Sequence, residues 1–139
     1  MRLLSRKGKT DLIRKIPLFS ECSRSELEAV ATVADEIHLP EGRVLIRQGD
    51  VGRELFVLVD GKVEVERDGK RLGTKSTGDF LGEIAVVTRR PRTATVTALT
   101  DVRVLVLTDL NFKRLLADVP SISGKVLKAL GDRLAADTV

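Results

Sequence analysis

The sequence predicts a mainly β domain with flanking helices, built as a sandwich or a small barrel. Its middle part, residues 36–107, contains short apolar runs rich in β-branched residues. Turn signals lie between these runs, and Asp60-Gly61 and Asp68-Gly69 are typical of hairpins because tight hairpin turns need positive φ. Many short antiparallel strands at close spacing favour these two architectures. The expected strands are residues 44–46, 55–59, 63–66, 95–98 and 102–107.

A helix is predicted over residues 23–35, before the strands. Ser23 and Glu26 fit a capping box, in which each side chain satisfies a backbone N–H of the other residue. Apolar residues then recur at helical spacing, so one face of the helix should pack on the rest of the domain. They are Leu27, Val30, Ala31 and Ala34.

Two more helices are predicted over residues 109–136, after the strands. Asp109 can cap the first, and Pro120 ends it because proline is tolerated only in the first turn of a helix. Gly124 and Gly131 weaken the second helix, each by up to about 1 kcal/mol relative to alanine. This helix should therefore depend on docking, which makes it the candidate for a moving part.

Composition narrows the class of protein. The length of 139 residues suits one domain, and 42% hydrophobic with 32% charged residues is a globular balance. No apolar run approaches the roughly 20 residues that cross a bilayer, and no signal-peptide core precedes the domain, so we expect a cytoplasmic protein without a membrane span. Cys22 is the only cysteine and His38 the only histidine, which leaves too few ligands for a zinc site.

The net charge of +4 is concentrated at the N-terminus. Residues 1–19 carry six basic side chains and one acidic side chain, so the rest of the chain is nearly neutral. Nucleic-acid readers more often show a basic face with aromatic platforms, and this chain has four Phe but no Trp or Tyr. We interpret residues 1–17 as a solvated basic leader or helix. Contact of this leader with an anionic surface is the alternative.

The segment of residues 78–96 interrupts the strand pattern and carries the chemistry. Gly82 lacks a Cβ, so backbone can approach a ligand closely there. A helical turn from Glu83 presents free N–H groups that favour an anion, and the Glu83 carboxylate suits a sugar hydroxyl. Arg92, after Pro91, offers a planar fork of donors for two phosphate oxygens. Taken alone, Glu83 and Arg92 can equally be two surface charges.

Catalysis is not expected. A metal-dependent jelly-roll enzyme needs several histidines and a carboxylate around its metal, which His38 alone cannot supply. A Ser/His/Asp set would need a nucleophile motif, and none is present. We therefore predict no catalytic residue and no metal site.

The run Gly-Glu-Ile-Ala-Val-Val-Thr-Arg-Arg-Pro-Arg-Thr-Ala-Thr-Val, residues 82–96, resembles the phosphate-binding cassette of the cyclic-nucleotide-binding domain family. That family includes catabolite-activator-type regulators, regulatory subunits of cAMP-dependent kinase and cyclic-nucleotide-gated channels. Residues 46–50 and 55–65 also look like its strand and hairpin segments. The resemblance implies a β-roll, a jelly-roll-like double-stranded β-helix, over residues 36–107 inside a single domain of residues 18–139.

The resemblance implies a role for each cassette residue. Glu83 should accept the ribose 2′-OH, with Gly82 beside the ribose. Arg92 should pair with the cyclic phosphate, and the backbone N–H groups of Ile84 and Ala85 should help to hold it. The expected ligand is cAMP.

The sequence predicts how the phosphate is bound more closely than it predicts which purine base is bound. The Thr93 hydroxyl could bond the phosphate or a purine edge, so cGMP remains possible. The last helix of the family can cover the base, and Leu130, Arg133 and Leu134 are the candidates here.

We expect a regulatory domain that reports its ligand by moving its C-terminal helices. A protein partner or self-association should read that movement. The chain ends five residues after Leu134, too soon for a recognition helix, so direct DNA binding is not expected. The alternatives are a binding-dead domain used for protein contact, or the regulatory fragment of a longer transcription factor or channel.

Overall fold

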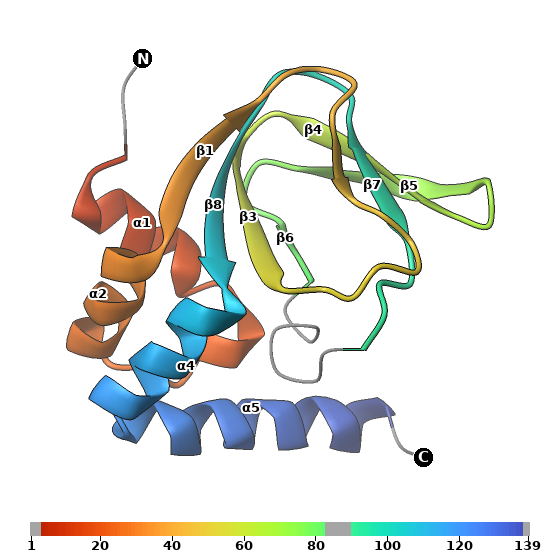
Figure 1. Ribbon diagram of the computed structural model, residues 1–139. Helices are drawn as coiled ribbons and strands as arrows, with labels where there is room; N and C mark the ends of the chain where they lie inside the picture. The colour runs from red at the N-terminus through yellow and green to blue at the C-terminus, as the bar shows by residue number, and fades with distance from the viewer. Residues whose placement is uncertain (1–3, 83–89, 138–139) are drawn as a thin grey trace. The chain divides into compact units, whose positions relative to one another are not determined.

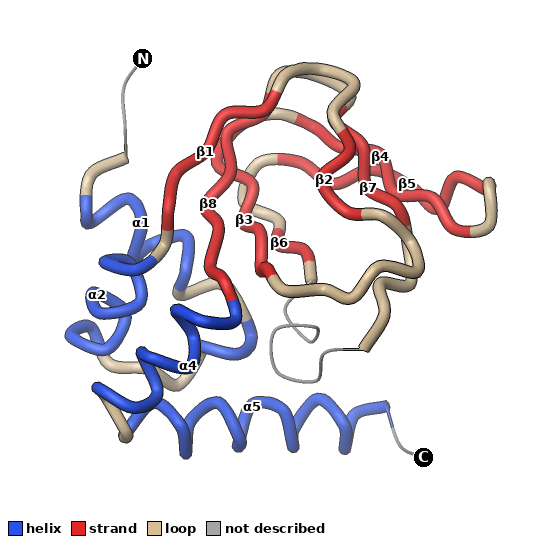
Figure 2. The backbone as a smooth tube through the Cα atoms, in the orientation of Figure 1, coloured by secondary structure: helices blue, strands red, loops and turns tan. Residues whose placement is uncertain are grey.

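The computed structural model describes residues 4–82 and 90–137, which form two compact units. One unit is residues 35–109 and holds the described strands, and the other joins residues 1–34 to residues 110–139 and is helical. Figure 2 shows this division of the chain into strand and helix. The predicted class, mainly β with helices on both sides in sequence, is confirmed.

The strand unit contains two four-stranded antiparallel sheets (Figure 1). The strand order is β1-β8-β3-β6 in one sheet and β2-β7-β4-β5 in the other. Apart from β4 and β5, which pair within one sheet, strands that are neighbours in sequence lie in different sheets, which is the winding of a β-roll. The strands are β1 (Asp35–Leu39), β2 (Val44–Ile46), β3 (Glu54–Asp60), β4 (Lys62–Arg67), β5 (Lys70–Ser76), β6 (Phe80–Leu81), β7 (Thr95–Ala98) and β8 (Val102–Thr108).

The core of this unit lies between the two sheets. Successive side chains on a strand point to opposite faces, so every second residue of β3 and β8 contributes to it. Burying each of these side chains contributes about 1.5–3 kcal/mol. The cluster consists of Ile46, Phe56, Leu58, Val63, Leu81, Val96, Ala98, Val102, Val104 and Val106.

The two Asp-Gly turns differ. Asp68 (φ +53°) and Gly69 (φ +77°) close the β4–β5 hairpin as predicted. The hairpin prediction for Asp60-Gly61 is wrong, because β3 and β4 pair with other strands and belong to different sheets. Gly61 instead turns the chain from one sheet to the other at φ +105°. A Cβ there would lie 2.6 Å from the carbonyl oxygen of Asp101.

The helical unit contains α1 (Arg6–Ile13), the 3₁₀ helix η1 (Pro17–Phe19), α2 (Arg24–Val33), α4 (Asp109–Asp118) and α5 (Ser121–Asp137). The predicted capping box is present at α2. The Glu26 backbone N–H donates to Ser23 Oγ at 3.3 Å, and the Ser23 N–H donates to Glu26 Oε1 at 2.7 Å. Pro120 separates α4 from α5, as predicted.

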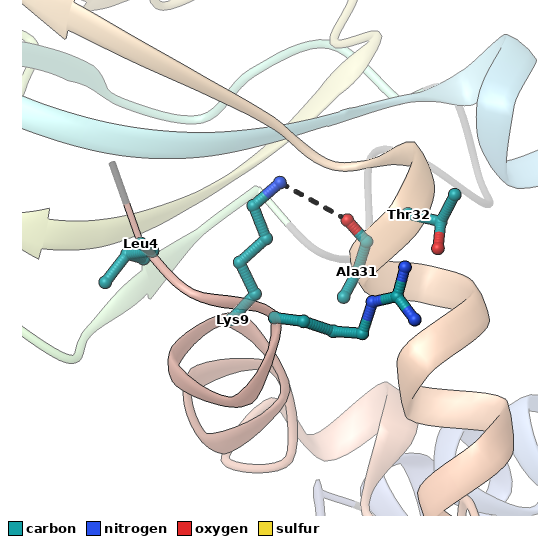
Figure 3. Close-up of a pocket in the computed structure, with 5 residues that line it drawn as sticks. Leu4, Lys9, Ala31 and Thr32 are labelled. Carbon is teal, nitrogen blue, oxygen red and sulfur yellow. Dashed lines mark hydrogen bonds between the residues drawn. The ribbon is translucent and has the colours of Figure 1, made fainter. Parts of the chain in front are cut away.

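The basic leader is more structured than the sequence indicated. Ile13 and Ile16 are 2% and 1% exposed, so the expectation of a solvated segment is wrong for this part. Lys9 extends from α1 to the end of α2 and donates to the carbonyl oxygen of Ala34 at 3.0 Å. It also donates to the carbonyl oxygen of Ala31 at 3.5 Å, the contact that Figure 3 shows. An ammonium there compensates the negative end of the helix dipole.

Candidate ligand-binding site around Arg92

The backbone of Arg92 is fixed by the loop that precedes β3. The Arg92 N–H donates to Asp50 O at 2.7 Å, and the Gly49 N–H donates to Arg92 O at 2.8 Å. An isolated β-bridge between Val51 and Pro91 extends this contact. Both the backbone N–H and the carbonyl oxygen of Arg92 are therefore hydrogen-bonded to this loop, just before β7 begins.

The side chain of Arg92 is buried. The residue is only 8% exposed. Its Nη2 donates to the carbonyl oxygen of Glu54 at 2.5 Å, and its Nη1 donates to the carbonyl oxygen of Gly82 at 3.5 Å. The Glu54 carboxylate is the nearby anion, with Oε2 at 3.8 Å from Nη2. Backbone carbonyls thus aim the guanidinium, and within residues 4–82 and 90–137 the carboxylate that pairs with it is that of Glu54, at 3.8 Å.

Burial sets the electrostatics of this site. It lowers the pKa of the Arg92 guanidinium, and the Glu54 carboxylate acts in the opposite direction. Arginine stays charged in proteins despite such shifts. The fold therefore carries a desolvated cation that a second anion would stabilise.

Gly82 lies directly against this cation. Its φ is +79°, which disfavours any residue with a Cβ. A Cβ built there would be 1.9 Å from Arg92 Nη1 and 3.1 Å from Glu54 O. From the sequence, this glycine is predicted to leave room for a ligand. The structure adds that the glycine clears space for the arginine.

The structure places the predicted site residues as follows. Gly82 and Arg92, ten positions apart in sequence, are brought into contact. Thr93 is exposed, and its carbonyl oxygen accepts a hydrogen bond from Arg67 Nε at 2.8 Å. The other predicted residues, Glu83, Ile84 and Ala85, lie outside the described residues, so their roles stay predictions.

Sequence reasoning missed Glu54. It is the first residue of β3, and its alternation with Phe56 and Leu58 puts it on the face that forms the core. A carboxylate on a core-facing position needs a cation nearby, and this signal could have identified Glu54 before the structure did. Which cation it meets depends on the pairing of distant segments, which no local pattern shows.

Glu54 also borders a hollow in the strand unit. The hollow has a volume of about 240 Å³, and Arg43 lies on its wall together with Glu54. The rest of the lining is apolar and comes from both sheets. These residues are Ile37, Leu39, Val44, Leu45, Phe56, Val104 and Val106.

Other chemistries find little support in the described ranges, 4–82 and 90–137. They hold no cluster of three or more His, Cys, Asp or Glu side chains that could bind a metal ion. No helix within them is long and apolar enough to cross a membrane. Burial raises the pKa of the Cys22 thiol to about 11, so at neutral pH it is not a thiolate nucleophile.

The fold is thus a β-roll in which a buried arginine lies against a glycine corner, and comparison with known proteins identifies its family. The model of the cyclic nucleotide-binding domain family matches residues 36–119. The chain belongs to this family, as the resemblance of residues 82–96 implied.

Three similar proteins illustrate the family. The cAMP-dependent protein kinase regulatory subunit of Emericella nidulans is 36% identical over 79% of this chain and 27% of its own length. A cyclic nucleotide-gated potassium channel of Rhizobium etli is 31% identical over 88% of this chain and 34% of its own length. The solved N-terminal domain of a transcriptional regulator from Streptomyces coelicolor A3(2) is 29% identical, covers 92% of this chain and 95% of that one, and superposes with a TM-score of 0.86.

The chain spans about a third or less of the length of these two curated relatives. What is shared with them is therefore the binding module.

Proposed function

We propose that this chain binds cAMP as a regulatory ligand and has no catalytic activity of its own. The observation that carries the proposal is the buried Arg92 guanidinium, for which desolvation outweighs the attraction of its one carboxylate partner among the described residues, Glu54. A cyclic phosphate carries one negative charge and two free oxygens that match the planar donor fork of arginine. Binding would bring a second anion, beside the Glu54 carboxylate, to this guanidinium.

The cassette residues complete the proposed site. Glu83 accepts the ribose 2′-OH, and Gly82 lies beside the ribose. The backbone N–H groups of Ile84 and Ala85 share the phosphate with Arg92. This assignment rests on the match of residues 82–96 to the family motif and on the contact between Gly82 and Arg92.

We propose cAMP as the ligand, with cGMP as the second candidate. The similarity to a cAMP-dependent kinase regulatory subunit favours cAMP. Thr93 is exposed and follows Arg92 directly, so its hydroxyl is available to a phosphate or a purine edge, and cGMP is the second candidate.

The proposed output is a movement of the C-terminal helices, α4 and α5. In support, the helices and the strands form separate compact units. A cytoplasmic protein partner or a second copy of the chain would read this movement, within a functional domain of residues 18–139 and without direct DNA contact. A binding-dead domain used for protein contact is the alternative, and the buried cation of Arg92 argues against it.

Calorimetric titration with cAMP, cGMP and AMP tests the proposal. We expect cAMP to bind and Arg92→Ala to weaken binding by about 30-fold to several thousand-fold, because the buried phosphate loses its charged partner. Arg92→Lys keeps the charge but loses the fork, so it should also bind more weakly. Arg24→Ala, which removes an exposed arginine that pairs with Glu28 on the surface, is the control and should bind like the parent. Equal binding by the parent and Arg92→Ala contradicts the assignment.

A further inference from the structure

The Glu54 carboxylate lies beside the Arg92 guanidinium. Its Oε2 lies 3.8 Å from Arg92 Nη2, near the outer limit of an ion pair. The carboxylate side chain is 44% exposed, while the arginine side chain is 7% exposed. The pair thus has a buried cation and a partly solvated anion.

Glu54 contacts Arg92 in two separable ways. Its carbonyl oxygen accepts from Arg92 Nη2 at 2.5 Å, a contact that any residue at this position could make. The Gly82 carbonyl supplies a second contact, from Nη1. The guanidinium is therefore aimed by backbone atoms, and the Glu54 carboxylate mainly adds negative charge.

This inference rests on the proposed function. We propose that the Glu54 carboxylate is an internal competitor of the ligand phosphate for Arg92, and that it thereby sets the affinity of the site. An anion bound to the guanidinium comes within several ångströms of the carboxylate, and like charges at that distance repel. Ligand binding must overcome this repulsion or displace the carboxylate.

The structure offers the displaced carboxylate a destination. Glu54 borders the hollow of about 240 Å³, so its side chain has room to turn away from Arg92. Arg43 lies on the wall of the same hollow and is a cation that the released carboxylate can meet. When the Glu54 carboxylate moves from Arg92 to Arg43, the free-energy cost of binding the phosphate at Arg92 falls.

The test is a titration of Glu54→Gln with cAMP. The substitution keeps the size of the side chain and the backbone carbonyl while removing the charge, so we expect about 3- to 30-fold tighter binding at low salt. The gain should shrink as added salt screens the partly exposed carboxylate. Glu28→Gln is a matched control, because the Glu28 side chain is 41% exposed and its Oε1 lies 3.6 Å from Arg24 Nε. The control should bind like the parent.

The outcomes separate the two proposals. If the parent binds cAMP and Glu54→Gln binds equally or more weakly, Glu54 is no competitor and the inference is overturned while the proposed function stands. If neither protein binds any cyclic nucleotide, the proposed function fails, and the inference fails with it.

Arg43→Gln tests the exchange itself. It should weaken cAMP binding by about 2- to 10-fold in the parent, because the released carboxylate loses its second partner. In the Glu54→Gln variant, Arg43 has no released carboxylate to pair with. Adding Arg43→Gln should therefore leave the cAMP affinity of that variant unchanged. An equal effect in both backgrounds overturns the exchange between Arg92 and Arg43.

Discussion

Two buried charges, Glu26 in the helical unit and Arg92 in the strand unit, are compensated to very different degrees. Glu26 is 5% exposed, forms an ion pair with Lys125, and accepts hydrogen bonds from Ser121 Oγ at 2.6 Å and the Ser23 backbone N–H at 2.7 Å. The hydrogen bonds from Lys125, then Ser121 and then Ser23, lower its pKa to about 2. The fold thus stabilises this charge by itself.

Within the part of the chain that the structure describes, Arg92 has two carbonyl acceptors and one carboxylate at 3.8 Å, and burial lowers its pKa. At Glu26 the hydrogen bonds outweigh the desolvation of the carboxylate, whereas at Arg92 desolvation outweighs the attraction of Glu54. A charge with a full set of internal partners stabilises structure, whereas an under-compensated buried charge marks a site for an external ligand. Three substitutions and one change of pH, ordered from the largest expected effect to the smallest, test this difference between Glu26 and Arg92.

Gly82→Ala should have the largest effect. The added Cβ meets Arg92 Nη1 at 1.9 Å in a backbone conformation of φ +79°, so the arginine must move or the corner must unwind. We expect a loss of about 2–4 kcal/mol in the free energy of unfolding, measured by urea denaturation, together with weakened cAMP binding. Gly124→Ala is the control, because a Cβ there meets nothing within 4 Å and should be neutral or stabilising. Unchanged stability and binding in Gly82→Ala would show that the glycine corner does not constrain Arg92.

Glu26→Ala should come next, because it breaks an internally compensated charge. It removes the partner of Lys125 and Ser121 on α5 and half of the capping box on α2. We expect about 2–3 kcal/mol of destabilisation in the same denaturation experiment. Glu28→Ala, which removes an exposed carboxylate from the same helix, should change stability by less than about 1 kcal/mol. Similar small losses in both variants would contradict the structural role of Glu26.

These two predictions show where sequence reasoning succeeds. The capping box was predicted because Ser23 and Glu26 are three residues apart on one helix. The family was identified from residues 82–96, a motif that is continuous in sequence. The Asp68-Gly69 turn could also be predicted from the local sequence, because both residue types tolerate the positive φ that they adopt in the structure.

The failures come from contacts between distant segments. Lys125 is 99 positions from Glu26, and Glu54 is 38 positions from Arg92. Gly61 was predicted to close a hairpin because the local pattern does not show that β3 and β4 join different sheets. The burial of Ile16 in a basic leader likewise depends on the tertiary packing of the helical unit. Strand pairing and helix packing decide each of these, and one sequence does not display them.

Acidification should lower the free energy of unfolding, because it protonates Glu26. The pKa of Glu26 falls from its ordinary value of 4.5 to about 2 in the folded state, so folding favours the ionised carboxylate. Its contribution is fully present above pH 4.5 and is lost as the pH falls toward 2. Because Lys125 is one-third exposed and solvent screens the pair, we expect a loss of about 1–2 kcal/mol.

The measurement is the free energy of unfolding at several pH values between 5 and 2 for the parent and for Glu26→Gln. The variant cannot titrate at this position, so its profile should be flatter by that amount. Parallel profiles for the two proteins would mean that other carboxylates account for the acid sensitivity.

Arg92→Met should have the smallest effect on stability, and this makes it the sharpest test of the comparison. Without ligand, the substitution removes a desolvated charge and keeps apolar bulk, so the free energy of unfolding should change by less than about 1 kcal/mol in either direction. Lys125→Met, the matched change at the compensated pair, should cost about 1–3 kcal/mol because Glu26 keeps a buried charge without its ammonium. With cAMP at about 100 times Kd the parent gains about 2.7 kcal/mol, and Arg92→Met should gain almost nothing under the same conditions. If Arg92→Met alone unfolds the strand unit, Arg92 is a structural charge like Glu26, and the distinction between the two regions no longer points to a ligand.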